Sequence, residues 1–279
     1  MPEIYVTKFN GARQLFDKGK IVQTCLRMGA GKEAAELVAE EVERRVYDGV
    51  STEKILQMVF RYLGKYYPRI KHRIDLRRAI SLLRSKPDFE KYVRLVLRKQ
   101  GYRVTPNRII RGKCVEHELD GVAIKGGETL MLEVKHHYNH HTYTGLDPSR
   151  IAWATLEDLN EGYELGLNPE KFTGAMIVCN TKFSQHAKQY SECRGLLNIG
   201  WREPPEHGLE RMIEEDKLYP ITFLRGLNGK ERTSLLDEGV ILLNHLASQE
   251  VESLSRRTDI SKSKLKLMIK KSGEILSPA

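Results

Sequence analysis

The stretch HELDGVAIKGGETLMLEVK, residues 117–135, specifies the local fold at the centre of the chain. It contains two runs of β-branched and apolar residues on either side of Gly126-Gly127, a pattern that predicts a β-hairpin. Successive side chains of a strand point to opposite faces, so Glu133 and Lys135 share one face. The hairpin also brings Asp120, near the end of the first run, towards Glu133.

The combination of two carboxylates and one ammonium, at Asp120, Glu133 and Lys135, indicates a type of catalytic site. Two converging carboxylates can hold a hard divalent cation through oxygen ligands. Such a cation polarises a phosphate and lowers the pKa of its bound water, while a neighbouring ammonium orients that water or helps to deprotonate it. These are the functional groups that hydrolysis of a phosphodiester requires. Taken alone, the Asp…Glu-x-Lys pattern also fits a surface strand with alternating charges.

The residues around the hairpin predict an α/β domain with a mixed sheet flanked by helices. An apolar stripe after Pro87 predicts a helix that ends at Gly101. The patterns that follow predict strands over 102–110, 115–124 and 129–135, a helix over 149–165, a strand over 173–179, a helix over 184–193 and a strand over 196–201.

Residues 87–201 resemble the restriction-endonuclease-like superfamily with the PD-(D/E)xK signature, and its Mrr-like branch in particular. The resemblance is carried by Phe89-Glu90, by Gly101-Tyr102 and by residues 117–120, 132–135 and 180–184. It implies that Asp120 and Glu133 bind Mg²⁺ or Mn²⁺, and that Lys135 and Glu90 complete the catalytic set. The sequence departs from the family in two ways: no proline precedes Asp120, and the Mrr-like Gln-x-Lys is Glu133-Val-Lys135.

Two features beside these residues have more than one interpretation. The cluster His136-His-Tyr-Asn-His-His141 contains His pairs at a spacing that suits a transition metal on a helix. Because no helix is evident there, we favour a loop at the mouth of the active site that contacts phosphate or base. Glu118, two residues before Asp120, is either a further metal ligand or an exposed strand acid.

The positive charge of the chain is concentrated in one segment. Residues 61–113 contain 17 Lys or Arg against three acids, although the whole chain carries a net charge of only +9. Such a segment can pair with phosphates and release their counterions, or it can form a solvated helix face. Because it leads directly into the hydrolytic motif, we favour nucleic acid, and DNA is the expected partner.

The N-terminal region predicts a small hairpin at Asn10-Gly11, helices over 20–28 and 32–47, a third helix from Ser51 or Thr52, and a basic helix over 69–84. Residues 4–80 resemble an ATP cone, a nucleotide-sensing module, through residues 6–11, 16–21 and 51–55. The resemblance implies a nucleotide site at Lys8, Gly11 and Lys20 with ATP or dATP as effector. Phe9 stands where the family usually has Arg. A second interpretation therefore remains, in which the cone no longer binds nucleotide and serves as a docking module.

The C-terminal part predicts a linker followed by short helices. Pro204-Pro205, Gly208 and Asn228-Gly229 indicate connecting structure. Beyond them, the tail resembles a helix-hairpin-helix module that binds DNA backbone, although its Gly-x-Gly hairpin is missing. The expected domains are a cone over 1–85, a nuclease domain over 86–205, a linker over 206–230 and a helical domain over 231–279.

Composition limits the class of protein. Of the 279 residues, 40% are hydrophobic and 30% charged, and no run of about 18 apolar residues occurs. The start lacks the pattern of a signal peptide, and four dispersed cysteines disfavour disulfides and a cysteine zinc site. We therefore expect a cytoplasmic protein with reduced thiols and no membrane contact.

The sequence as a whole predicts a metal-dependent DNA endonuclease under the control of ATP or dATP. A homodimer is expected because cutting both strands needs two active sites. Two alternatives remain: a non-catalytic, nucleotide-sensing DNA-binding regulator, and a nuclease that acts on RNA or branched DNA.

Overall fold

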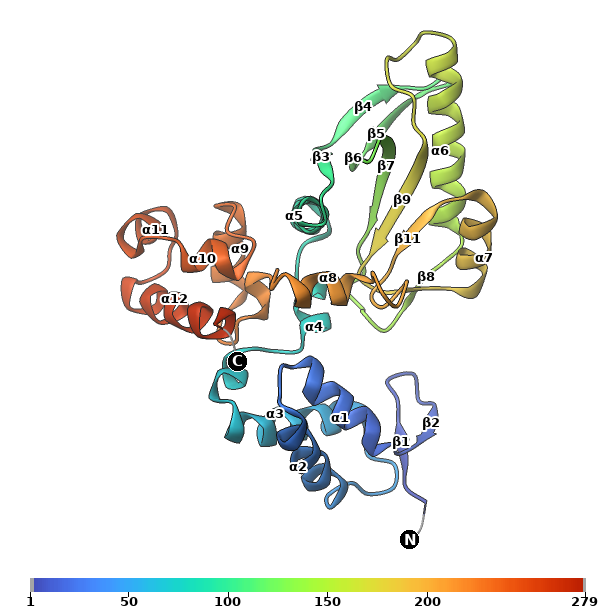
Figure 1. The fold of residues 1–279 in the computed structure, drawn as a ribbon. Coiled ribbons are helices and arrows are strands. Elements are labelled where there is room, and N and C mark those ends of the chain that lie inside the picture. Colours follow the sequence, from blue (N-terminus) through green and yellow to red (C-terminus); the bar gives the residue numbers. More distant parts are fainter. Residues whose placement is uncertain (1–2, 278–279) are drawn as a thin grey trace. The chain divides into compact units, whose positions relative to one another are not determined.

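The structure is a computed structural model that describes residues 3–277 (Figure 1). It divides into two compact units. The first comprises residues up to Ile74 together with Leu224–Ser234 and the segment from Leu243 onward. The second comprises Asp75–Phe223 and Leu235–Leu242, and it contains the residues that carry the predicted chemistry.

The second unit is built on a five-stranded mixed sheet with the order β11-β9-β7-β6-β3. β7 pairs antiparallel with β6 and parallel with β9, so the α/β prediction is confirmed. β9 is buried along its whole length, as expected for a strand covered on both faces. The strands of this sheet are β3 (Arg103–Thr105), β6 (Gly121–Lys125), β7 (Glu128–Lys135), β9 (Gly174–Cys179) and β11 (Leu197–Ile199).

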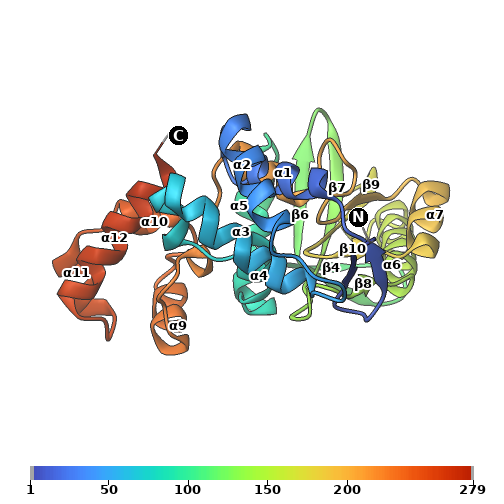
Figure 2. The same ribbon diagram turned by 90° about the horizontal axis from the view of Figure 1, so that it is seen from below.

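Helices cover both faces of this sheet. α5 (Glu90–Lys99) and α6 (Asp147–Glu164) lie on opposite sides of it, and α7 (Gln185–Arg194) lies beside α6 (Figure 2). The core under α6 joins Leu156 and Leu159 of the helix to Met131 and Ile177 of the two central strands. The unit also contains α4 (Leu76–Ser81), the turn η2 (Ser85–Phe89), the short strands β8 (Tyr143–Thr144) and β10 (Lys182–Phe183), α8 (Leu209–Glu215) and the 3₁₀ turn η3 (Ile221–Phe223).

Two of the expected strands are each broken in two. The strand expected over 102–110 ends at Thr105, because Pro106 has no N–H to continue the ladder, and resumes as β4 (Arg108–Arg111). The strand expected over 115–124 divides at Asp120 into β5 (Glu116–Leu119) and β6. At Gly121 a Cβ atom would lie 2.7 Å from the carbonyl oxygen of Thr105, so only glycine fits there. β4 and β5 form a separate two-stranded ribbon.

The loop that joins β4 to β5 is fastened to α6 by the Asp158 carboxylate. This carboxylate accepts hydrogen bonds from the Cys114 amide and from the His117 ring, both at 2.8 Å. Burial alone raises the pKa of Asp158, but hydrogen bonds from His117 and Cys114 outweigh burial and hold this pKa below its ordinary value. The folded state therefore favours the ionised form.

Replacing Asp158 with asparagine is expected to destabilise the protein by about 1–2 kcal/mol at pH 7. Because the pKa of Asp158 is lower in the folded chain, its contribution is complete above about pH 4 and disappears as the pH falls towards the folded value. Urea unfolding at pH 7 and pH 3 measures this, with exposed Glu157→Gln as the control. An equal difference from the wild type at both pH values would contradict this role of the charge.

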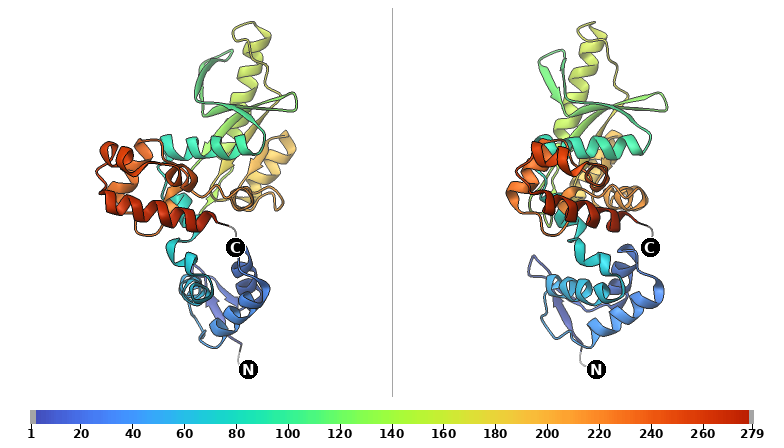
Figure 3. Two further views of the ribbon diagram at one scale, coloured as in Figure 1. Left: turned by 60° about the vertical axis from the view of Figure 1, so that its left-hand side comes forward. Right: turned by 90° about the vertical axis from the view of Figure 1, so that its left-hand side faces the viewer.

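The N-terminal part of the first unit is a hairpin beside three helices (Figure 3). Strands β1 (Tyr5–Thr7) and β2 (Arg13–Leu15) pair antiparallel. Asp17 caps α1 by accepting from the Lys20 amide, and Ser51 caps α3 by accepting from the Lys54 amide. Apolar residues of the helices form one core. The helices are α1 (Lys18–Arg27), α2 (Lys32–Glu43) and α3 (Thr52–Tyr66).

The prediction of a single basic helix over 69–84 is wrong. The segment forms the 3₁₀ turn η1 (Pro68–His72) and then the helix α4. Arg73 between them is extended, and Asp75 starts a new helix by accepting a hydrogen bond from the Arg78 amide at 2.9 Å. The basic residues thus belong to two elements, and they do not share one helix face.

The stretch expected as a linker over 206–230 is largely structured. Leu209, Ile213 and Ile221 are buried there, in α8 and η3, because the proline and glycine residues separate short helices. Short helices follow in the tail, as expected: α9 (Gly229–Asp237), α10 (Leu243–Ala247), α11 (Val251–Arg257) and α12 (Lys262–Leu276).

The cysteines are free thiols: Cys25 and Cys179 are buried, whereas Cys114 and Cys193 are exposed. Among residues 3–277, no helix has the length and apolar character needed to cross a bilayer.

Candidate active site

Asp120 and Glu133 stand opposite each other on neighbouring strands. The antiparallel register pairs Gly121 with Leu132, which places Asp120 across from Glu133 at the next position. The Asp120 side chain is only 8% exposed, and its Oδ2 accepts a hydrogen bond from the Val134 amide at 2.8 Å. Glu133 and Lys135 share one face of β7, as predicted, and their Oε1 and Nζ atoms are 2.5 Å apart. The break between β5 and β6 thus sets the Asp120 carboxylate against the backbone of β7.

Glu90 enters the same site from the first turn of α5. Its side chain is only 3% exposed, and its Oε2 accepts a hydrogen bond from Asn107 Nδ2 at 3.1 Å. Arg94, one turn further along α5, donates to Asn107 Oδ1 and to the Asp120 carbonyl oxygen, both at 2.9 Å. Glu90 Oε1 is buried and lies 3.3 Å from the Lys86 ammonium. The structure therefore brings Glu90 to Asp120, as the resemblance implied.

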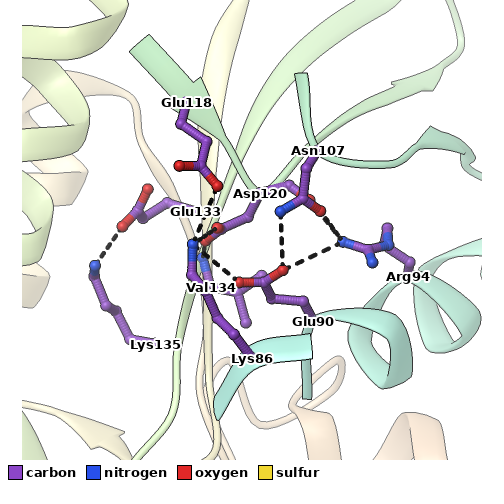
Figure 4. A network of polar contacts seen from close by, with 9 residues as sticks. All are labelled: Lys86, Glu90, Arg94, Asn107, Glu118, Asp120, Glu133, Val134 and Lys135. Atoms are coloured by element: carbon purple, nitrogen blue, oxygen red, sulfur yellow. Dashed lines mark hydrogen bonds and ion pairs between the residues drawn. The ribbon is translucent and has the colours of Figure 1, made fainter. Parts of the chain in front are cut away.

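The ammonium of Lys86 lies between these acids (Figure 4). Its Nζ is 3.3 Å from Glu90 Oε1, 3.4 Å from Asp120 Oδ1 and 3.6 Å from Glu118 Oε1. Glu118 thus faces the site and is also largely exposed; its role as a further metal ligand stays a prediction. Lys86 was not predicted, because in a segment so rich in Lys and Arg nothing in the sequence distinguishes one lysine from its neighbours.

Burial and neighbouring charges shift the pKa values of this cluster in opposite directions. Burial raises the pKa of Glu133, and the hydrogen bond from Lys135 only partly offsets that effect. Burial alone lowers the pKa of Lys86, but the negative charges of Asp120 and Glu90 outweigh it, so this pKa is raised. The site is a partly buried carboxylate cluster whose negative charge is met by two ammonium groups.

The chemistry of the donors fits a hard divalent cation. Carboxylate oxygens are the ligands that Mg²⁺ and Mn²⁺ prefer, and Glu90 Oε1 is a buried oxygen whose near neighbour is the exposed Lys86 side chain. The groups are not yet arranged around one point: within residues 3–277 no three His, Cys, Asp or Glu form a ready metal site. The Asp120 carboxylate faces Lys86 while that of Glu133 faces Lys135 (Figure 4). Metal binding by Asp120 and Glu133 stays a prediction.

The histidine cluster after β7 has partners that explain its first two members. The ring of His136 lies within hydrogen-bonding distance of Ser85 Oγ, at 3.1 Å, and of the Ile80 carbonyl oxygen, at 3.2 Å. The backbone of His137 donates to Asn180 Oδ1 and accepts from Asn180 Nδ2, both at 2.8 Å. These contacts describe an anchored loop, and in the described residues the cluster forms no metal site. Asn180 begins a stretch that carried the family resemblance, but its clamp on His137 was not predicted.

The predicted nucleotide residues lie in the turn of the N-terminal hairpin and in the first turn of α1. Lys8 is exposed in the hairpin turn, where its carbonyl accepts from the Gly11 amide, and Gly11 has a φ of +78° that favours glycine. Lys20 is exposed in the first turn of α1, with its Nζ 3.8 Å from Asp17 Oδ2. Two other basic residues nearby are paired with acids, Arg13 with Asp48 and Lys18 with Glu43. Nucleotide binding by this surface stays a prediction.

Comparison with family models divides the chain into three consecutive parts. The model of the ATP cone domain matches residues 4–86, and that of the restriction endonuclease domain matches residues 84–198. The model of the AF1548-like C-terminal region matches residues 219–276. The two resemblances that the sequence motifs indicated, and their order along the chain, are thereby confirmed.

The chain is also similar over part of its length to uncharacterized proteins and to a solved structure. An uncharacterized protein of Archaeoglobus fulgidus is 33% identical over 181 residues, which cover 65% of this chain and 98% of the relative. A second uncharacterized protein of that organism is 54% identical over 39 residues, 14% of this chain and 83% of the relative. The crystal structure of the protein of unknown function AF1548 superposes with a TM-score of 0.56 at 33% identity, covering 67% of this chain and 95% of that one.

Proposed function

We propose, because the chain belongs to the family of the protein of unknown function AF1548 and itself contains a restriction endonuclease domain, that it is a metal-dependent DNA endonuclease. The observation that carries this proposal is the convergence of two buried carboxylates, Asp120 and Glu90, on one cation beside the Glu133–Lys135 pair. Buried carboxylates are costly unless cations pair with them; here Lys86 and Lys135 do so, and such charged clusters are common at catalytic sites.

Each residue of the site has a distinct part in the proposed reaction. Asp120 and Glu133 would hold Mg²⁺ or Mn²⁺, which when bound polarises the phosphate and lowers the pKa of a water. Lys135 orients the attacking water and helps to remove its proton. Glu90 adds negative charge from α5 and is held in place by Asn107 and by Arg94, whose Nη1 is 3.8 Å from Glu90 Oε2.

The basic segment supports a nucleic-acid substrate, and DNA is our choice. Lys91, Arg98, Lys99 and Arg103 are exposed on α5 and at the start of β3, so they are free to neutralise phosphates. A panel of duplex, methylated, branched and single-stranded DNA and of RNA, with and without Mg²⁺, tests the choice. Cleavage of RNA or branched DNA alone would favour that alternative, and binding without any cleavage would favour the regulator.

The domain organisation follows the same assignment. As stretches of the sequence, we retain 1–85 for nucleotide sensing, 86–205 for the nuclease and 231–279 for binding DNA backbone; in space, the chain from Leu243 onward belongs to the same compact unit as the residues up to Ile74. Cutting both strands needs two sites, so we propose a homodimer. Sedimentation of the full chain with and without DNA tests this, and a monomer that nicks only one strand would contradict it.

ATP or dATP is expected to raise the melting temperature of the full chain by a few degrees, because a ligand that binds only the folded state stabilises it. Lys8→Ala combined with Lys20→Ala should remove the shift, since these are the exposed cations of the predicted site. Lys32→Ala, at the exposed start of α2, should keep it. A thermal shift assay measures all three proteins. If neither nucleotide changes the melting temperature or the cleavage rate of the wild type, the cone is a degenerate docking module.

A further inference from the structure

We propose that Lys86 is a built-in competitor of the divalent cation: its ammonium occupies the cation position of the carboxylate cluster and must leave before a metal binds. This inference rests on the proposed function, because Asp120 and Glu90 belong both to the proposed catalytic set and to the contacts of Lys86, and it adds a residue and a step that the family resemblance did not supply.

The first argument is the position of the Lys86 ammonium. Its Nζ lies within 3.3–3.6 Å of one oxygen from each of three carboxylates, those of Glu90, Glu118 and Asp120. These acids come from α5, from β5 and from the β5–β6 junction, so their common point is made by the tertiary fold (Figure 4). An ammonium carries one positive charge against three carboxylates, and a divalent cation would balance that charge better.

The second argument is that the two cations exclude each other. Mg²⁺ binds carboxylate oxygens at about 2.0–2.1 Å and Mn²⁺ is similarly hard. A metal on the oxygens that Lys86 now contacts would lie within a few ångströms of the ammonium, and like charges so close together in a partly buried site repel strongly. In the structure the three oxygens lie 3.3–3.6 Å from the Lys86 ammonium, distances longer than those of bound Mg²⁺.

The third argument is that Lys86 is held at this point by its backbone and yet is free to leave. Lys86 is extended, with φ −121° and ψ 138°, and the residues before and after it in this segment are anchored by side-chain contacts. Ser85 Oγ is 3.1 Å from the His136 ring, and Arg84 pairs with Asp88 at 2.5 Å. The Lys86 side chain itself is 61% exposed, whereas those of Glu90 and Asp120 are 3% and 8% exposed. The ammonium can therefore swing into solvent while the carboxylates stay in place.

Mn²⁺ binding to the full-length protein, measured by calorimetry, tests the competition. Lys86→Met removes the competing charge and is expected to lower the dissociation constant for Mn²⁺ by about tenfold or more. Lys86→Arg keeps a cation and should bind Mn²⁺ no more tightly than the wild type. Lys91→Met, at an exposed position on α5 that contacts none of these acids, is the matched control and should leave the constant unchanged.

A second measurement needs no variant. If Mn²⁺ displaces Lys86, the metal must expose that amine, because coupling between two ligands is reciprocal. Saturating Mn²⁺ is therefore expected to raise the rate of Lys86 acetylation by an amine reagent about fivefold or more, read by mass spectrometry, while Lys91 is unaffected.

The outcomes separate this inference from the proposed function. Tighter Mn²⁺ binding by Lys86→Met and faster labelling of Lys86 would support it. Equal Mn²⁺ affinity in both proteins, with unchanged labelling, would overturn the competitor role and leave the metal-dependent nuclease standing. No Mn²⁺ binding in either protein would overturn both.

Discussion

Lys135→Met and Asp120→Asn are each expected to lower phosphodiester cleavage by about a thousandfold or more, while DNA binding changes little. Methionine has nearly the length of lysine, so Lys135→Met removes the ammonium that faces Glu133 without opening a gap. Asparagine at position 120 can still accept the hydrogen bond from the Val134 amide, but it removes the buried negative charge. Both changes thus remove the chemistry and keep the local structure.

Relaxation of supercoiled plasmid in Mg²⁺ measures this first effect, and circular dichroism checks that each variant is folded. Glu128→Gln is the matched control, because Glu128 is an exposed acid at the other end of β7. It should cleave like the wild type. If both Lys135→Met and Asp120→Asn retain cleavage within a factor of a few, the assigned site is not where hydrolysis occurs.

Asn180→Ala is expected to cost about 2–4 kcal/mol of folding stability and to reduce cleavage as well. Asn180 is fully buried, and it satisfies both the amide and the carbonyl of His137. Its removal leaves two polar backbone groups without those partners, which is the costly case for a lost hydrogen bond. β7 and β9 end side by side, with Lys135 paired to Cys179, so this clamp also fixes the chain just beyond Lys135.

Urea unfolding of Asn180→Ala measures the loss of stability. Asn139→Ala is the control, because exposed Asn139 makes its side-chain contact within the same loop; it should cost less than about 1 kcal/mol. A loss of stability no larger in Asn180→Ala than in Asn139→Ala would show that the clamp does not hold the end of β7.

The hairpin and the sheet around it could be predicted because the turn and strand preferences of the local sequence match the structure found there. Gly126-Gly127 gives the turn and the run before Lys135 gives the central strand, as found in β6 and β7. The division of the expected strand 115–124 at Asp120 could not be predicted, because the alternation of apolar and polar residues does not show where a strand leaves one sheet for another. The break depends on the close approach of Gly121 to Thr105, which is a tertiary contact.

The acids that the structure brings together were predicted from the sequence, but the residues around them were not. Asp120, Glu133 and Lys135 stand on adjacent strands at short spacing, and the family motif added Glu90. Lys86 and Asn180 act through contacts with residues 34 and 43 positions away, at Asp120 and His137. Patterns within one element carry no information about such pairs. Nor does the motif show which carboxylate faces which cation, and Asp120 and Glu133 prove to face different lysines.

Diffraction from crystals soaked in Mn²⁺, with the anomalous signal of the metal recorded, tests most directly whether this protein holds a hard cation for hydrolysis. We predict a peak within about 2.5 Å of an Asp120 carboxylate oxygen, with the Lys86 ammonium turned away from it. Density for Mn²⁺ only at other surfaces, with Lys86 still seated among Glu90, Glu118 and Asp120, would contradict the proposed function.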